Sequence, residues 1–127
     1  MAKPDLVGIV VKDMPRSLAF YRLLGLDIPA EADSDAHVEV TLPGGFRIAW
    51  DTVEIVKGLL PDWREPSGHR MGLAFKCDSP EDVNRLYEAL MKAGYRGLKP
   101  PWDAFWGQRY AIVVDPDGNL VDLFASL

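Results

Sequence analysis

The same order of expected elements occurs twice along the chain, and this repeat constrains the fold more than any other feature. In the first half, the β-branched run 5–12 is typical of a well-buried strand. A helix is expected next, because Asp13 can cap its N-terminus and Pro15 falls in its first turn. The alternating segment 37–51 turns at Pro43 and two glycines, which predicts a β-hairpin. The first half is therefore expected to fold as β-α-β-β.

The second half repeats this order from residue 71 onwards. Segment 71–77 predicts a strand, and Ser79 can cap the helix that follows it. Gly94 is expected to end that helix, and segment 108–124 predicts a second hairpin that turns at Pro116 and Gly118. When Pro43 is aligned with Pro116, Ala49 matches Asp122 and His37 matches Tyr110.

These halves predict an α+β fold in which two βαβββ modules form a half-open barrel around a cleft. A short extra strand is expected after each helix, around residues 26–28 and 96–99. Within a single domain spanning 1–127, module one covers about 1–52, a linker about 53–69, and module two about 70–127. One helical turn is expected in the linker around 56–60. Strand parity predicts which side chains face the cleft: His37, Glu39, Thr41, Arg47, Ala49, Asp51, Gln108, Tyr110, Ile112, Leu120, Asp122 and Phe124.

Charge and composition argue against several classes of partner. The chain has 14 Lys and Arg against 19 Asp and Glu, a net charge of −5, so a nucleic-acid partner is not expected. Its single cysteine, Cys77, cannot form an internal disulfide and fits a reducing compartment. No apolar run approaches the length of a membrane span. We therefore expect a soluble cytoplasmic protein with no membrane partner.

One carboxylate in the last strand needs an explanation. Asp122 lies between Leu120 and Phe124 on a face that is expected to be buried, and a buried charge is costly unless it is paired or bound to a metal. Asp122 could thus be a metal ligand, a hydrogen-bond acceptor, or the partner of Arg47 or Arg109 in an ion pair.

Aromatic residues provide the remaining chemical signal. Trp102, Phe105 and Trp106 fall in segment 99–110, which is expected to be a Pro-led loop leading into the cleft. Large rings in such a segment often cover a pocket and stack on a flat ligand, although they can also close the end of a core. Trp50 has the opposite strand parity and is expected in the core.

Five polar groups could orient a ligand beside these rings: His37, Asp51, Gln108, Tyr110 and Asp122. Each of them could instead be a solvated strand residue or a satisfied core hydrogen bond. No order of Ser, His and Asp, or of Cys and His, suggests a nucleophile, and no Gly-rich loop leads into a helix to hold phosphate. The residues therefore predict no catalytic group and no cofactor.

The stretches "VGIVVKDMPRSLAFYRLLGL" and "WGQRYAIVVDPDGNLVDLF" resemble the vicinal-oxygen-chelate superfamily, which includes glyoxalase I, extradiol dioxygenases and bleomycin-binding proteins. The resemblance implies paired βαβββ modules around a cleft, often in a dimer. It also implies four metal-ligand positions, which fall here at Leu6, Ala49, Met71 or Gly72, and Asp122. Three of these cannot bind a metal, so the resemblance implies a metal-free protein in which Asp122 is a former ligand position reused as a hydrogen-bond acceptor.

Within the superfamily, the chain looks most similar to the metal-free, mitomycin-resistance type of drug-binding protein. That likeness implies a homodimer that sequesters a planar aromatic or quinone antibiotic, with a pocket built by His37, Asp51, Tyr110 and either Trp102 or Trp106. Two alternatives stay open. One is a metal-dependent glyoxalase-type lyase or dioxygenase that uses His37, Glu39 and Asp122, and the other is a binder of a native aromatic metabolite.

Overall fold

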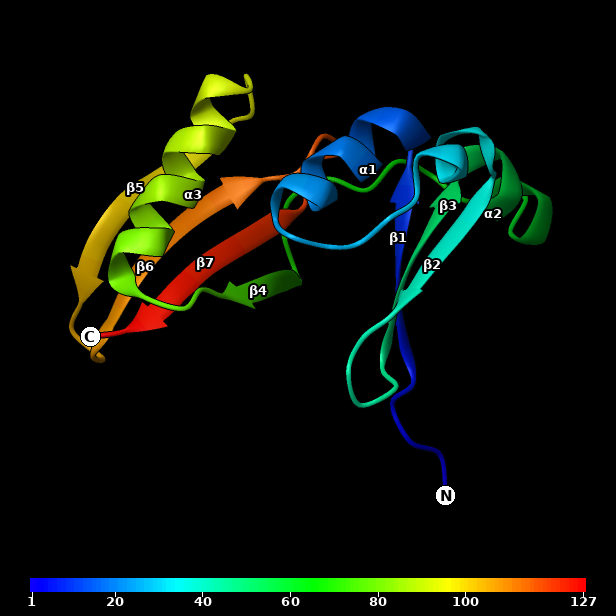
Figure 1. The fold of residues 1–127 in the computed structure, drawn as a ribbon. Helices are drawn as coiled ribbons and strands as arrows, with labels where there is room; N and C mark the ends of the chain where they lie inside the picture. The colour runs from blue at the N-terminus through cyan, green and yellow to red at the C-terminus, as the bar shows by residue number, and fades with distance from the viewer. The chain divides into compact units, whose positions relative to one another are not determined.

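The computed structural model describes residues 1–127 and divides into two compact units, Met1–Pro66 and Ser67–Leu127 (Figure 1). The boundary falls inside the segment expected to be a linker. One unit holds a three-stranded sheet and the other a four-stranded sheet, and neither sheet closes into a barrel. The expected α+β class is confirmed. The longest helix has 13 residues, and none of the helices could cross a membrane.

The first unit contains β1 (Leu6–Val11), α1 (Met14–Leu23), a 3₁₀ turn η1 (Ala30–Ser34), β2 (His37–Thr41), β3 (Arg47–Thr52) and α2 (Val53–Leu59). The strand order is β1-β3-β2, with β1 parallel and β2 antiparallel to β3. Asp13 caps α1 by accepting a hydrogen bond from the Arg16 amide at 3.0 Å, as expected. Burial in β1 is confined to Ile9 and Val11, so the prediction of a well-buried strand there is wrong.

The extra strand predicted around residues 26–28 does not form. The side chain of Arg22 donates hydrogen bonds to the carbonyl oxygens of Ile28 and Pro29, each at 2.8 Å. Pro29 has no amide proton, and these carbonyls already accept hydrogen bonds from Arg22. The segment therefore has few free backbone donors or acceptors with which to pair with a neighbouring strand.

The core of the first unit lies between α1 and the sheet. Trp50 on β3 is fully buried, as the parity of the strand predicted, and its ring centroid lies 5.3 Å from that of Tyr21 on α1. Leu18 and Phe20 of α1 are also fully buried. The helix therefore anchors the sheet through large aromatic contacts.

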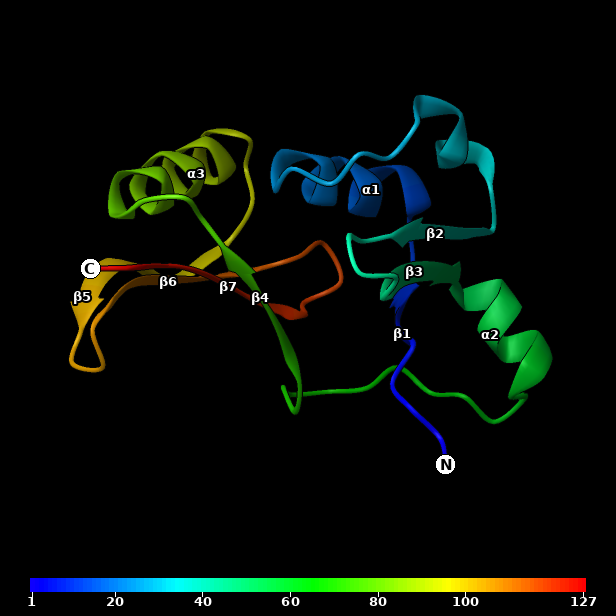
Figure 2. The same cartoon turned by 60° about the horizontal axis from the view of Figure 1, so that its bottom comes forward.

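The second unit contains β4 (Gly72–Lys76), α3 (Pro80–Lys92), β5 (Gly97–Ala104), β6 (Gln108–Val114) and β7 (Leu120–Ser126). The strand order is β4-β7-β6-β5, with β4 parallel to β7 and the other pairs antiparallel. Helix α3 packs on one face of β5, β6 and β7 (Figure 2). The fully buried side chains of this unit include Val83, Leu90, Ala111, Val113, Val121 and Leu123.

The turn between β6 and β7 is organised by Asp115, which is only 3% exposed. Its Oδ1 accepts hydrogen bonds from the amides of Asp117 and Asn119, each at 2.9 Å, and its Oδ2 accepts one from Asn119 Nδ2. Gly118 supplies the expected positive φ of 87°. The turn thereby sets the register, in which Tyr110 lies opposite Phe124 and Ile112 opposite Asp122.

Two segments expected to be irregular are in fact regular. The linker begins with two turns of helix, α2, which Thr52 caps and which starts earlier than the single turn expected around 56–60. The supposed loop 99–110 is largely the edge strand β5, which places Trp102 opposite Tyr110. The register of β5 shifts on the approach to Trp102, where Pro100 and Pro101 lie, and prolines are tolerated at such irregular edge positions.

Candidate functional site

The predicted site residues fall into two groups, one in each unit. His37 and Asp51 belong to the first unit, on β2 and β3. The other five, which are Trp102, Trp106, Gln108, Tyr110 and Asp122, belong to the second unit. Each group is gathered by its own sheet.

The second unit has an aromatic face, which we define by Trp102, Trp106, Tyr110 and Phe124. The Trp106 centroid lies 5.3 Å from that of Tyr110 and 6.0 Å from that of Trp102, both edge to face. Tyr110 and Phe124 are nearly parallel, with centroids 6.1 Å apart and planes 26° apart. Side chains alternate along a strand, and Ala111, Leu123 and Ala125, which flank Tyr110 and Phe124 on the opposite face, are buried. The four rings therefore share the face of the sheet that α3 does not cover.

Asp122 lies on the same half-exposed face, so the prediction that this face is buried is wrong within this unit. Its Oδ2 accepts a hydrogen bond of 2.5 Å from the Tyr110 hydroxyl. The alternative ion pair with Arg109 does not form within this unit, and Arg47 belongs to the first unit. Arg47 pairs with Asp5 and Glu39, and Arg109 binds Asp103 and Asn84. The interpretation of Asp122 as a hydrogen-bond acceptor is confirmed.

The hydrogen bond from Tyr110 has an electrostatic consequence. Burial of the phenol and its bond to the Asp122 carboxylate raise the pKa of Tyr110 to about 12. The hydroxyl therefore keeps its proton at neutral pH and directs it to Asp122. The second carboxylate oxygen of Asp122 remains able to accept a bond from a ligand.

The turn between β5 and β6 adds a second polar group to the aromatic face. Trp106 Nε1 donates to Gln108 Oε1 at 2.8 Å, which leaves the amide nitrogen of Gln108 as a donor for a ligand. Lys99 Nζ lies 4.0 Å from the centroid of Trp102, in cation–π range. The ring of Phe105 contacts that of Trp106, and Phe105 is 97% exposed.

In the first unit, His37 belongs to a chain of ion pairs that crosses β2 and β3. Its Nδ1 lies 2.5 Å from Asp51 Oδ1 and its Nε2 lies 3.0 Å from Glu39 Oε2. Glu39 also binds Arg47 at 2.9 Å, and Arg47 binds Asp5 at 2.6 Å. The hydrogen bonds to Asp51 and Glu39 raise the pKa of His37, and each of its ring nitrogens has a carboxylate partner.

This chain predicts a pH dependence of stability. Because the folded pKa of His37 lies above its ordinary value of 6.5, its contribution is complete below 6.5 and is lost as pH rises through the raised value. The pKa of Glu39 is lowered by its hydrogen bonds to His37 and Arg47. Its contribution to stability is therefore present at pH values above its ordinary pKa of 4.5 and is lost only as the pH falls below that value. Urea unfolding should therefore show stability falling as the pH rises above 6.5. His37→Gln should abolish that fall, whereas His69→Gln at an exposed position should keep it. If stability fell with pH as steeply in His37→Gln as in the unmodified chain, the pH dependence could not be assigned to His37.

The residues do not fit the metal-ligand set that the resemblance implies. Leu6 lies opposite Arg47 and Gly72 opposite Leu120. Since Arg47 and Leu120 each follow the proline of their turn by four residues, Gly72 rather than Met71 is the counterpart of Leu6. Leu6, Ala49 and Gly72 have no donor side chain, and no group of three or more His, Cys, Asp or Glu side chains is arranged to hold a metal ion.

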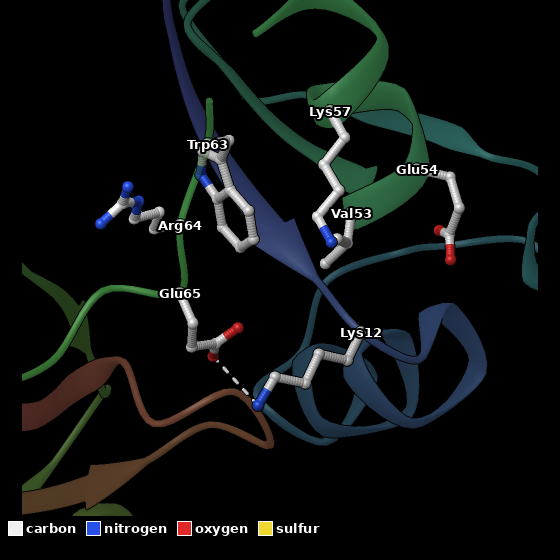
Figure 3. A pocket seen from close by; sticks show the side chains of 7 residues that line it. All are labelled: Lys12, Val53, Glu54, Lys57, Trp63, Arg64 and Glu65. Atoms are coloured by element: carbon white, nitrogen blue, oxygen red, sulfur yellow. Dashed lines mark ion pairs between the residues drawn. The ribbon is translucent and has the colours of Figure 1, made fainter. Parts of the chain in front are cut away.

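One further pocket was not anticipated from the sequence. It has a volume of about 520 Å³ and lies between α2 and the segment that follows it in the first unit (Figure 3). Seven residues line it: Lys12, Val53, Glu54, Lys57, Trp63, Arg64 and Glu65. The one sequence feature that could have indicated this pocket is Trp63, which lies between Pro61 and Pro66 in an otherwise charged segment.

Comparison with solved structures supports the fold. A glyoxalase/bleomycin resistance protein/dioxygenase family enzyme from Burkholderia phytofirmans PsJN is 24% identical, with a TM-score of 0.84 over 99% of this chain and 100% of that chain. A superfamily member from Sphaerobacter thermophilus DSM 20745 is 27% identical, with a TM-score of 0.69 over 99% and 98% of the two chains. A glyoxalase-related enzyme from Fulvimarina pelagi is 20% identical, with a TM-score of 0.79 over 99% and 89%.

A search of curated proteins gave no match. Residues 3–123, nearly the whole chain, match the family described as the Glyoxalase/Bleomycin resistance protein/Dioxygenase superfamily. The matched range includes both repeats and all the candidate site residues except Phe124. The chain belongs to the glyoxalase/bleomycin resistance protein/dioxygenase superfamily.

Proposed function

We propose that this superfamily member is a metal-free binding protein that sequesters a planar aromatic or quinone antibiotic by stacking. The observation that carries the proposal is the aromatic face, where Trp102, Trp106 and Tyr110 contact one another and Tyr110 stacks beside Phe124. Half-exposed rings that converge in this way offer a large apolar surface to a flat ligand.

The ring geometry favours a ligand that lies over the face rather than between two plates. The contacts of Trp106 with Trp102 and Tyr110 are edge to face, so these rings do not form a parallel slot. Tyr110 and Phe124, which are nearly parallel, instead present neighbouring ring faces from adjacent strands. A flat molecule can cover both rings, with Trp106 at its edge.

Two polar groups set the length of the ligand. Asp122 lies opposite Ile112, which is four residues along β6 from Gln108. Four residues of a strand span about 13 Å, less the distance by which the side chains lean inward. A single ring is too short to reach both groups, whereas two or three fused rings can do so.

These two groups also set the chemistry of the ligand's ends. The Gln108 amide nitrogen donates, and so selects a carbonyl or another acceptor. The free oxygen of Asp122 accepts, and so selects an amino or hydroxyl group. An amino-hydroxyquinone that carries these groups at opposite ends of its planar frame has both features, and the net charge of −5 suits a neutral or cationic guest.

The hydrogen-bond partners of Tyr110 and His37 favour binding over catalysis. The Tyr110 hydroxyl donates to Asp122, and both ring nitrogens of His37 lie against carboxylates, so neither side chain presents an unpartnered base to a ligand. The metal-dependent alternative would take His37 and Glu39 from the first unit and Asp122 from the second, and binding in the presence of EDTA separates it from the metal-free proposal. A native aromatic metabolite would use the same face, and only a ligand screen separates it from an antibiotic.

Tryptophan fluorescence tests this proposal, with N-acetyltryptophanamide as the control for light absorbed by the ligand. We expect saturable quenching by 2-amino-6-hydroxyanthraquinone, whose amino and hydroxyl groups lie at opposite ends of the three-ring frame, and we would titrate mitomycin and bleomycin beside it. Binding of the single-ring 2-aminoacetophenone should be weaker by about ten-fold or more, because it loses stacking area and one polar contact. Binding should persist in EDTA, and the ligand should be recovered unchanged.

Three outcomes would contradict the proposal. No saturable quenching by any planar compound would argue against the aromatic face as a binding site. Binding that EDTA abolishes, or a ligand recovered in altered form, would favour the metal-dependent enzyme instead.

A further inference from the structure

The pocket beside α2 is separate from the aromatic face, because all of its lining residues belong to the first unit. Figure 3 shows the indole of Trp63 turned into the pocket, with Val53 and Lys57 of α2 on the opposite side. Lys12 and Glu65 lie at another edge, where they form an ion pair of 3.0 Å. The pocket thus combines one aromatic wall, one aliphatic wall and a charged rim.

The segment that carries Trp63 is held in place by its backbone. The Trp63 amide donates to the Leu60 carbonyl at 2.9 Å, directly after the end of α2. Pro61 and Pro66 on either side restrict the conformations of the chain. Because the indole is half-buried and its backbone is restrained, a ligand that stacks on it would lose little binding energy to ordering this wall.

The lining of the pocket has a net positive charge, whereas the whole chain has a net negative charge. The lining has three cations, Lys12, Lys57 and Arg64, against two carboxylates, although the whole chain has a net charge of −5. Lys12 and Glu65 neutralise one another. Neither Lys57 nor Arg64 has a carboxylate within ion-pair distance in the structure, whose ion pairs use other residues.

The position of Lys57 makes it the group that selects a ligand. Its ammonium group points toward the interior of the pocket on the side facing Trp63, whereas Glu54 lies on the far side of Val53 and Lys57 from that ring (Figure 3). On the side facing Trp63, Lys57 is therefore available to an anionic ligand, because Glu65 at the other edge is already paired with Lys12.

We propose that this pocket binds a small aromatic carboxylate, with its ring between Trp63 and Val53 and its carboxylate on Lys57. An aromatic ring satisfies the apolar walls, and a carboxylate supplies the counter-charge that Lys57 lacks. The pocket is open to solvent on one side, so affinity is weak and depends on salt. This site would bind an anion, whereas the aromatic face suits a neutral or cationic guest.

The test is a titration of the ¹⁵N-labelled full chain with salicylate and with salicylamide, followed by NMR. The two probes have the same ring and differ in the carboxylate. We expect salicylate to shift the indole signal of Trp63 and the amides of Val53 and Lys57, and salicylamide to bind about ten-fold more weakly, as expected for the loss of one charged contact.

Lys57→Met should weaken salicylate binding about ten-fold and bring it close to that of salicylamide, because the methionine keeps the apolar stem without the charge. Lys92→Met on α3 is the matched control and should bind salicylate like the unmodified chain. Trp63→Phe, which keeps a ring, should retain part of the binding, whereas Trp63→Ala should lose it.

Equal affinity for the two probes would overturn the proposal, as would salicylate shifts that leave Trp63 unaffected. So would retained discrimination in Lys57→Met. Because the NMR signals identify the residues that respond, a failure here is distinguishable from a failure of the aromatic face to bind quinones.

Discussion

Replacing Trp106 with alanine is expected to weaken binding of a three-ring quinone by about ten-fold or more. The indole contacts Trp102, Phe105 and Tyr110, and its Nε1 fixes Gln108 through a hydrogen bond of 2.8 Å. Its loss removes one ring from the face, worth about 0.5–1.5 kcal/mol beyond area burial, and leaves the Gln108 amide free to rotate. Together these losses exceed the roughly 1.4 kcal/mol that corresponds to ten-fold.

Phe105→Ala is the matched control for this substitution. Phe105 is the preceding residue in the same turn and is also aromatic, but it is 97% exposed and makes a ring contact only with Trp106. Quinone affinity should stay within about two-fold of that of the unmodified chain, since surface substitutions of this kind usually have small effects. Unchanged affinity in Trp106→Ala, or equal losses in both variants, would contradict the role given to Trp106.

Replacing Trp50 with alanine is expected to lower the free energy of unfolding by about 3–5 kcal/mol. The ring is fully buried on β3 and packs against Tyr21 of α1. Alanine would leave a cavity where α1 anchors the sheet of the first unit, and the packed surroundings can only partly relax into it. Urea unfolding followed by circular dichroism measures the loss.

Trp50→Phe separates packing from hydrogen bonding at this position. Trp50 Nε1 is buried and no acceptor lies within hydrogen-bond distance, so phenylalanine removes an unsatisfied donor along with part of the ring. We expect Trp50→Phe to cost less than half as much as Trp50→Ala. A loss below about 1 kcal/mol in Trp50→Ala would show that the indole is not a main anchor of the first unit.

The sequence predicted most of the elements because each has a local cause. The helix starts at Asp13 and Ser79 follow from side-chain caps, and both caps form. The second hairpin follows from the turn residues after Asp115, and its register then places Tyr110 beside Asp122. Strand parity likewise predicted the burial of Trp50.

The errors arise where side chains from elsewhere decide the outcome. Nothing in residues 26–28 shows that Arg22 will occupy the neighbouring carbonyls. Two adjacent prolines suggested a loop before Trp102, but β6 pairs with this segment despite shifts in register. The partner of Asp122 was not predicted from sequence either: the two candidate donors were Arg47 and Arg109, whereas the structure places the Tyr110 hydroxyl on its carboxylate.

The most direct test of the aromatic face as the ligand site is an NMR measurement of contacts between ligand and protein protons. The full chain would be saturated with 2-amino-6-hydroxyanthraquinone, and nuclear Overhauser effects from its ring protons would be assigned. The account predicts contacts to the side chains of Trp106, Tyr110 and Phe124, which share one face of the sheet of β5, β6 and β7. Saturable binding with contacts only to residues of the first unit would contradict it.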